Sequence, residues 1–456
     1  MQNSKESQLH RGLEERHIAL MSLGAAIGVG LFLGSASAIK LAGPAIIISY
    51  AIGGLMIYLI MRALGEMAIK NPVAGSFSRY ASEFVGPLAG YITGWNYWFV
   101  WIATCMAEIT AVGIYMQFWF PGTPQWAWAL AALAIMTTIN FLAVKAYGEL
   151  EFWFALVKIV TIILMIVLGF GMIIFGLGNG GIAVGFGNLV EHGGFFPNGI
   201  SGVILSFQMV MFAYLGIEML GVTAGEVKNP EKSLKRAIDT VFYRILLFYV
   251  LALTVILSIT PWDQMNGKDS PFVMMFDKIG IPGAAGIIQF VVLTAALSSC
   301  NSGIFSTGRM LFNLAQQGES PKSFERTTKS GVPGVAIIVS AVVLLFGVYL
   351  NYMEAEKVFS YVTSVATFGA LWTWGTILVT QIISRRKMSP GEKQGLAYKM
   401  PLFPFTSYFT LAFLVFVMVI LGFSADTRIA LIVGPIWIVL LVVLYYVTGL
   451  NKRKKG

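Results

Sequence analysis

The sequence predicts an all-α polytopic membrane protein with twelve transmembrane helices. Of its 456 residues, 57% are hydrophobic and only 12% are charged, and the mean hydropathy is +0.76. A soluble domain carries about twice that share of charged residues, so too few polar side chains exist to cover a globule in water. Because about 20 apolar residues span a bilayer core, the chain has room for about a dozen spans with short connections.

Twelve apolar runs of spanning length follow one another along the chain. Turn and loop signals separate them, among them Pro121-Gly122 and the glycine-rich stretch 176–187. The first run follows a polar segment without a cleavage pattern, so we expect a retained helix rather than a signal peptide. The predicted spans are 17–39, 43–69, 90–119, 124–144, 152–176, 200–224, 241–261, 282–315, 333–350, 357–383, 403–423 and 428–449.

The basic residues predict the topology. The two tails and every second loop hold 25 of the 31 Lys and Arg residues, whereas the loops on the other side hold five. By the positive-inside rule, both termini are expected in the cytoplasm. The net charge of +9 therefore indicates orientation and contact with anionic lipid headgroups rather than nucleic-acid binding.

The first span contains three glycines within seven residues, Gly24, Gly28 and Gly30. Each weakens a helix by about 1 kcal/mol relative to alanine. A break at membrane depth is tolerated only where the backbone faces protein or a water-filled cavity. Taken alone, the pattern fits a broken helix and close helix packing, through Gly24 with Gly28 or Gly30 with Gly34, equally well.

A second anomaly, five spans later, favours the broken helix. The sixth span places Gly216 and the carboxylate of Glu218 in the middle of an apolar run. Paired interruptions in two five-helix halves predict the inverted repeat of a secondary transporter, with a substrate site between the broken helices near the midplane. Half-helix N-termini suit a carboxylate and freed carbonyl groups suit an ammonium, so a zwitterionic amino acid is the expected substrate.

Ionisable residues inside spans are costly and usually functional. Glu108 is a candidate for proton coupling or substrate contact, the alternative being a buried structural hydrogen bond. Lys158 lies two turns into the fifth span, too deep for easy snorkelling, and is a candidate to hold freed carbonyl groups where another transporter would use a sodium ion. Glu218 is a candidate proton site, the alternative being a cap on freed N–H groups. Glu66 is expected to be structural, paired with Arg62 at i,i+4.

A polar run in the eighth span, Ser298, Asn301 and Ser302, and Thr104 in the third span could line the pathway or supply interhelical hydrogen bonds. No paired catalytic carboxylates, nucleophile elbow, phosphate-binding loop or metal-ligand pattern occurs in the sequence. We therefore expect no enzyme activity, no cofactor, no metal and no obligate protein partner.

Several motifs spread over the chain are typical of one family. They are Arg11-Gly12-Leu13 with Arg16-His17-Ile18, Ala26-Ile27-Gly28-Val29-Gly30-Leu31-Phe32, Ala42-Gly43-Pro44, Met61-Arg62-Ala63-Leu64-Gly65-Glu66-Met67, Gly148-Glu149-Leu150-Glu151-Phe152-Trp153-Phe154 and Thr223-Ala224-Gly225-Glu226. With them the sequence resembles, nearly end to end, the bacterial amino acid permeases of the amino acid, polyamine and organocation (APC) superfamily.

The resemblance implies a fold of two inverted five-helix repeats, with helices 1 and 6 broken, plus two extra C-terminal helices. It implies a multi-pass protein of the cytoplasmic (inner) membrane whose uptake is driven by the proton gradient. The corresponding segments are an N-tail at 1–16, repeats at 17–176 and 200–383, helices 11 and 12 at 403–449, and a basic C-tail at 450–456.

The resemblance also implies a role for each break. The substrate carboxylate would be bound at the first break, by Ala26, Ile27, Gly28, Val29 and Gly30. The amino group would be bound at the second, by Phe212, Ala213, Tyr214, Leu215 and Gly216, with Phe212 as an aromatic gate. Lys158 would stand in for sodium and Glu218 would sense protons. Val29 departs from the family, since a threonine is often found there.

The substrate is less sharply indicated. The sequences of 208–214 and 348–352 are similar to those of permeases for proline or histidine. The sequence of 107–113 is more like that of permeases for aromatic amino acids and for threonine and serine. We expect a proton-coupled symporter for a neutral amino acid, proline first. Histidine, threonine, serine, alanine, glycine and aromatic amino acids are the alternatives, and an amino-acid channel or a transport-like receptor is the alternative class.

Overall fold

The computed structural model describes residues 27–73, 75–141, 144–222, 230–266, 269–278, 283–328 and 331–452. All regular structure in these ranges is helical, and no strand occurs in them. Eight helical stretches are long and apolar enough to cross a bilayer, and two shorter apolar helices accompany them. The predicted class, an all-α polytopic membrane protein, is confirmed.

The helices of the first half follow the predicted spans in order. They are α2 (Val29–Phe32), α3 (Gly34–Ala42), α4 (Ile46–Lys70), α5 (Ser76–Phe84), α6 (Pro87–Met116), α7 (Gln125–Asn140) and α8 (Val144–Phe175). The second half and the C-terminal helices continue with α9 (Gly199–Ala213), α10 (Met219–Val222), α11 (Pro230–Ile245), α12 (Ala252–Ile259), α13 (Pro271–Lys278), α14 (Ala284–Gln316), α15 (Gly334–Met353), α16 (Val358–Lys387), α17 (Pro390–Gln394), α18 (Phe405–Ile420) and α19 (Ala430–Val447).

Some helices begin before the predicted apolar run. The seventh span was expected at 241–261, yet α11 begins at Pro230, continues through a π-helical stretch at Leu246–Leu251 and ends with α12. Hydropathy finds only the part of a helix that lies in hydrocarbon, whereas backbone hydrogen bonding continues into the polar interface. The short helices α5, α13 and α17 lie between the spans and were not predicted for the same reason.

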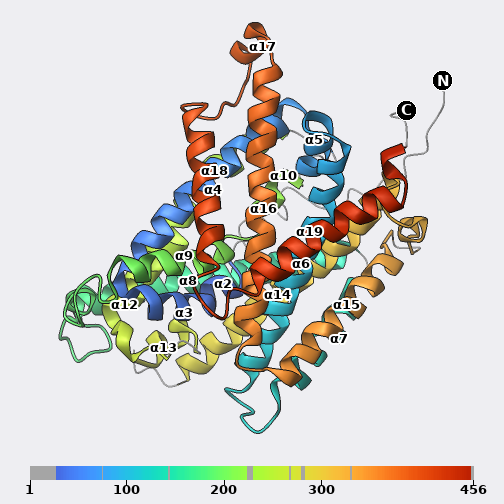
Figure 1. Cartoon of the computed structure of the whole chain (residues 1–456). Helices are drawn as coiled ribbons and strands as arrows, with labels where there is room; N and C mark the ends of the chain where they lie inside the picture. Colours follow the sequence, from blue (N-terminus) through green and yellow to red (C-terminus); the bar gives the residue numbers. More distant parts are fainter. Residues whose placement is uncertain are drawn as a thin grey trace.

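The centre of the molecule is the crossing of α6 with α14, two helices five spans apart (Figure 1). A Cβ added to Gly303 would lie 2.2 Å from the Cys105 sulfur, so only glycine permits this approach. The Cys105 thiol lies 3.8 Å from the Cys300 carbonyl oxygen, and both cysteines are free. Helices α7 and α15, also five spans apart, pack on one another beside this crossing.

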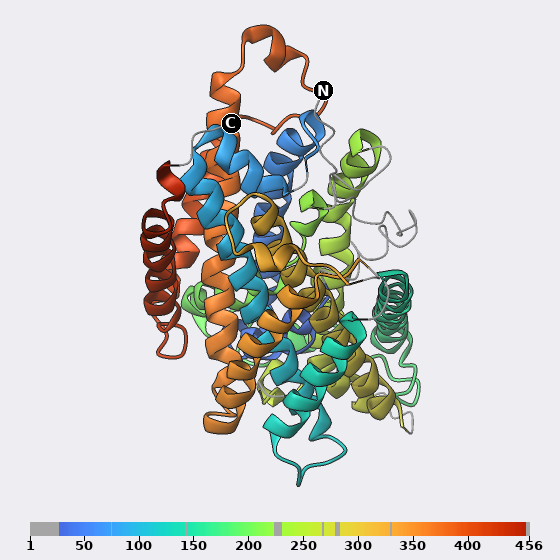
Figure 2. The ribbon, with the colours of Figure 1, turned by 90° about the vertical axis from the view of Figure 1, so that its right-hand side faces the viewer.

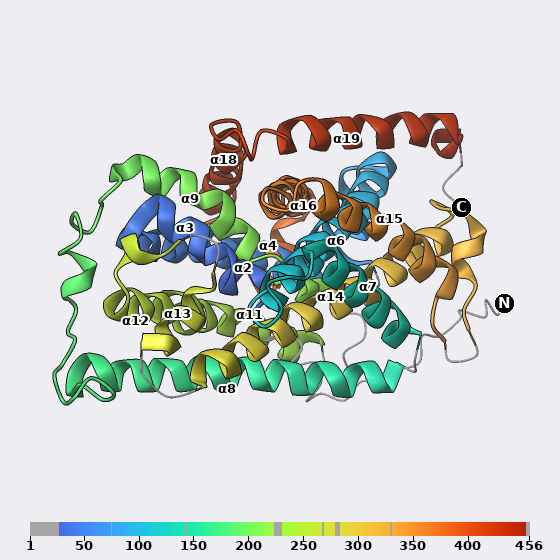
Figure 3. The same ribbon diagram turned by 90° about the horizontal axis from the view of Figure 1, so that it is seen from below.

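Further helices flank this core on two opposite sides. Figures 2 and 3 show α8 along one flank and α18 with α19 along the other. Their outward faces are apolar and exposed, as at Trp153 and Val167 on α8 and at Ile436 and Val443 on α19. In a membrane protein such faces contact lipid tails rather than water.

One end of the molecule, which carries α5 and α17 in Figure 1, holds two cross-helix ion pairs. Arg62 of α4 donates to Asp239 of α11 at 3.2 Å, and Arg385 of α16 donates to Glu66 at 2.6 Å. Gln381 also donates to Glu66, at 2.9 Å. The predicted pairing of Arg62 with Glu66 is therefore wrong, because each side chain has a partner on another helix.

Candidate substrate site

The first break lies where glycines predicted it. Gly28 is extended (φ −119°, ψ −162°), the short helix α2 follows it, and Leu33 separates α2 from α3. The first turn of a helix leaves its N–H groups without carbonyl partners of the same helix, and here that turn begins at Val29. Ala26 lies outside the described residues.

The second break separates α9 from α10. Helix α9 ends at Ala213, and the chain turns through 214–218 before α10 begins at Met219. Gly216 has φ +100°, in a region that favours glycine. The Tyr249 hydroxyl donates to the freed carbonyl oxygen of Ala213 at 3.0 Å.

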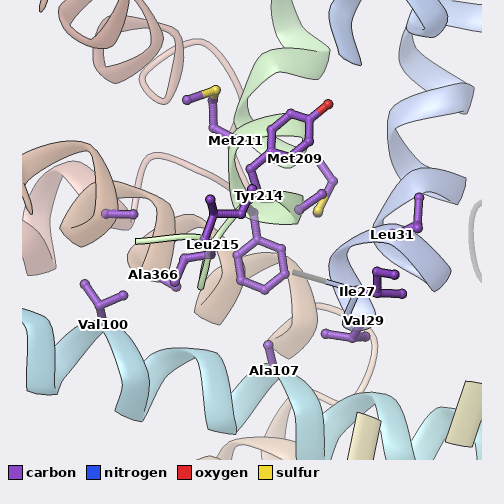
Figure 4. Packing of buried hydrophobic residues seen from close by; sticks show 14 of the residues in the cluster. Ile27, Val29, Leu31, Val100, Ala107, Met209, Met211, Tyr214, Leu215 and Ala366 are labelled. Atoms are coloured by element: carbon purple, nitrogen blue, oxygen red, sulfur yellow. The ribbon is translucent and has the colours of Figure 1, made fainter. Parts of the chain in front are cut away.

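The two breaks are in contact. A Cβ added to Gly30 would lie 2.6 Å from the Ala213 Cα, so the two backbones meet there. In Figure 4, Ile27 and Val29 of the first break and Leu215 of the second lie on opposite sides of one apolar cluster, which Ala107 of α6 also joins. Apart from Ala26, the residues predicted at the two breaks therefore come together.

Glu218 is held by donors from three places. The Tyr97 hydroxyl of α6 donates to its Oε1 at 3.2 Å, and the Trp374 indole N–H of α16 donates to its Oε2 at 3.3 Å. The Gly216 backbone N–H lies 3.2 Å from both oxygens. The Gly216 contact fits the capping alternative for Glu218, and the three donors orient its carboxylate between α6 and α16.

Glu108 lies directly behind the first break. Its Oε1 would be 3.0 Å from a Cβ added to Gly28, and the Ser299 hydroxyl would be 3.2 Å from the same point. That hydroxyl and the Val29 backbone N–H face the carboxylate as donors. Its Oε2 is buried and has no hydrogen-bond partner among the residues that the structure describes. This oxygen is therefore available to a proton or to a ligand.

Lys158 is fully buried, 1% exposed, on α8. Its ammonium donates to the Ser298 hydroxyl at 2.9 Å, and that hydroxyl donates to Glu151 at 2.7 Å. The charge of Lys158 also interacts with Glu108. Of the groups predicted at the site, Lys158, Ser298 and Glu108 are thus parts of one polar cluster behind the first break.

The remaining pathway candidates are buried and hydrogen-bonded. Thr104 donates to the Val100 carbonyl of its own helix at 2.8 Å. Asn301 accepts from Asn140 of α7 at 2.8 Å, and Ser302 faces Glu151. Among the described residues, no group of three His, Cys, Asp or Glu side chains is placed to hold a metal ion.

Three residues beside the two breaks were missed by sequence reasoning. Glu151 was taken as the polar edge of the fifth span, yet it is 1% exposed. Tyr97 and Trp374, which donate to Glu218, were not predicted as site residues, whereas Ser299 lies within the polar run 298–302 predicted in the eighth span. A polar residue at the edge of an apolar run, one or two turns from an intramembrane lysine, is the one signal that could have found Glu151.

The comparisons with known proteins agree with this geometry. The amino acid permease family matches residues 17–455. The chain belongs to this family. It is 68% identical over 453 residues to the uncharacterized amino acid permease YtnA of Bacillus subtilis (strain 168). The match covers 99% of this chain and 98% of that protein. The resemblance inferred from the motifs is confirmed, and this permease is a transporter rather than an enzyme.

Two further relatives carry substrate names. The probable threonine/serine transporter YbxG of Bacillus subtilis (strain 168) is 49% identical over 98% of this permease and 97% of its own length. The D-serine/D-alanine/glycine transporter of Escherichia coli (strain K12) is 46% identical over 96% of this permease and 93% of its own length.

Proposed function

We propose that this permease imports a small neutral amino acid together with protons across the cytoplasmic (inner) membrane, with both termini in the cytoplasm. The observation that carries the proposal is the contact between two interrupted helices, at Gly30 and Ala213, with a buried acid and a buried lysine behind the first. Such a pair of breaks offers N–H groups to a carboxylate and carbonyl groups to an ammonium.

The substrate would bind as a zwitterion between the breaks. Its carboxylate takes the N–H groups of the first turn of α2, after Gly28, where the helix dipole favours negative charge. Its ammonium takes carbonyl oxygens at the end of α9, around Ala213 and Tyr214. Phe212, which is buried and packs edge-on against Phe359, would close the site as an aromatic gate.

Glu108 is the better supported carrier of the coupled proton. One of its oxygens is buried and finds no hydrogen-bond partner in the described part of the chain, whereas the predicted carrier Glu218 accepts hydrogen bonds from several donors. Protonation would neutralise Glu108 at the point where the substrate carboxylate must enter, which links the two events electrostatically. Lys158 would supply the fixed cation that replaces sodium.

As the substrate, small neutral amino acids are favoured over proline, which the sequence analysis placed first. Two relatives with nearly full-length matches are named for threonine and serine, and for D-serine, D-alanine and glycine. Proline stays a candidate substrate, since 208–214 is similar to proline permeases. Histidine and aromatic amino acids follow.

We also propose that 17–176 and 200–383 are the two inverted repeats, followed by helices 11 and 12 at 403–449. The contacts of α6 with α14 and of α7 with α15 support this division, because each pair joins helices five spans apart. The two interruptions, at α2 and before α10, are five spans apart as well.

The test is uptake of labelled serine into proteoliposomes with an imposed inward proton gradient. All common amino acids are offered as competitors, and sodium and a proton uncoupler are varied separately. We expect accumulation that needs the proton gradient, ignores sodium and is competed by serine, threonine, alanine or glycine. Flux without accumulation or saturation would identify a channel, and binding without uptake a receptor. Sodium-dependent uptake that survives the uncoupler would reject proton coupling.

A further inference from the structure

A third carboxylate, Glu151, is buried near the centre of the polar cluster. It lies on α8 seven residues before Lys158, which is two helical turns and therefore the same helix face. Its side chain is 1% exposed, as is that of Lys158. A carboxylate in such a place is costly unless a cation or donors compensate for the lost water.

The Ser298 hydroxyl of α14 joins the two charged groups. Lys158 donates to this hydroxyl at 2.9 Å, and the hydroxyl donates to the Glu151 Oε1 at 2.7 Å. A hydroxyl has a single hydrogen, and an ammonium can only donate, so the direction of this chain is fixed. Glu151 is its acceptor end, and the lysine is its donor end.

Helix α14 presents adjacent hydroxyls to two different acids. Ser298 holds Glu151, and Ser299 faces Glu108 and the first break. The charge of Lys158 acts on both acids. Lys158 is thus linked to Glu151 through the Ser298 hydroxyl, and its charge also acts on Glu108 behind the first break.

We propose that Glu151 is a positioning residue for Lys158: through the Ser298 hydroxyl it supplies the counter-charge that keeps the ammonium charged and directed at the first break. This rests on the proposed function only in that transport needs Lys158. Burying an ammonium without a counter-charge carries a large desolvation cost. The attraction to a carboxylate, held through a well-placed hydroxyl, offsets that cost. Neutralising Glu151 should therefore mimic partial loss of Lys158.

Transport by three variants tests the role. Glu151→Gln should slow amino acid exchange in proteoliposomes on the order of tenfold or more, since a hydrogen bond to a charged group is lost. Glu151→Asp should recover part of the rate, and Ser298→Ala should act in the same direction as Glu151→Gln. The matched controls are Glu149→Gln, two residues earlier on α8, and Ser306→Ala, whose hydroxyl donates to the Ser302 carbonyl of its own helix at 2.7 Å. Both should exchange at the unmodified rate.

The pH profile separates positioning from general structural damage. The charged groups that act on Lys158 in the described part of the chain are Glu151 and Glu108, and Lys158 is the one that acts on Glu151. In Glu151→Gln the ammonium is less favoured, so exchange should fall more steeply as pH rises and recover towards low pH. A uniformly reduced rate with an unchanged profile would overturn the proposal.

A thermal double-mutant cycle tests the same link without using transport. Glu151→Gln and Lys158→Met should each lower the melting temperature in detergent, because each leaves one buried charge uncompensated. The melting temperature of the double variant should fall by clearly less than the sum of the falls in the two single variants. Additive shifts would overturn the proposal even if proton-coupled uptake were established, and a coupled cycle would support it even if uptake proved independent of protons.

Discussion

The Trp374 indole N–H donates to the Glu218 carboxylate at 3.3 Å, and this contact joins α16 to the second break. The Tyr97 hydroxyl of α6 holds the other oxygen at 3.2 Å. About three turns further along α16, Arg385 holds Glu66 of α4. Helix α16 therefore contacts both the second break and the α4 end of the molecule.

Trp374→Phe should slow amino acid exchange by about tenfold, with smaller effects on protein yield. The substitution keeps the ring and removes one donor to a charged group, which contributes about 1.5–3 kcal/mol. Exchange rates in proteoliposomes measure the effect. The matched control is Trp98→Phe, which removes an indole donor to the Ser340 hydroxyl at 3.1 Å. Equal losses in both variants would show that the contact with Glu218 has no special role.

Gly28→Leu or Gly30→Leu should abolish binding of every amino acid alike, because the lesion lies where the shared carboxylate binds. Even Gly30→Ala places a Cβ 2.6 Å from the Ala213 Cα, which is backbone and cannot rotate away. Gly286→Ala on α14 is the control, since its nearest atom would be 4.0 Å away. Thermal stabilisation by added amino acids gives the readout. Variants that only shift preference among side chains would place these glycines in the specificity pocket instead.

The fold and the breaks could be predicted from the sequence because both depend on local signals. Apolar runs set the spans, and Gly28, Gly30 and Gly216 mark the points where a helix cannot continue smoothly. Side-chain partners could not be predicted, since they depend on which helices become neighbours. Glu66 shows this well: its partner is 319 positions away on α16 rather than one turn away at Arg62.

Arg385→Met should lower the free energy of unfolding by about 3 kcal/mol or more, because it leaves the buried Glu66 carboxylate without its cation. Lys70→Met breaks a pair of the same type with Glu392 at 3.3 Å, but both partners are exposed. The loss of this exposed pair should cost much less, because water screens its charges. Denaturation in detergent, followed by tryptophan fluorescence, compares the two. Similar losses would mean that burial does not decide the strength of these pairs.

Glu108→Gln should leave substrate exchange running, independent of pH, while abolishing accumulation driven by the proton gradient. The amide mimics a neutral, protonated acid next to the first break. Glu218→Gln should instead slow exchange itself, because the amide nitrogen cannot accept from Tyr97 or Trp374. Counterflow and gradient-driven uptake are measured on the same vesicles. The reverse pattern, with pH-independent exchange only in Glu218→Gln, would move the coupled proton to Glu218.

Glu319 should make the stability of the protein depend on pH. It follows the end of α14, outside the spans, where its backbone carbonyl accepts from the Trp95 indole at 3.2 Å. Burial raises the pKa of its carboxyl to about 7, although the charge of Arg79 opposes this. The unfolded carboxyl titrates near its ordinary value, about 4.3, so the folded state binds more protons between these two values.

The contribution of Glu319 is therefore fully present below about pH 4 and is lost as pH rises through about 7. The melting temperature of the unmodified protein should fall between pH 5 and pH 8, and Glu319→Gln should flatten part of that fall because its side chain cannot ionise. Glu325→Gln, an exposed acid in the same loop, serves as the control and should leave the slope unchanged. If the slope of Glu319→Gln matched that of the control, the buried carboxyl would have no part in the pH dependence, and other groups, such as the buried acids of the polar cluster, would have to account for it.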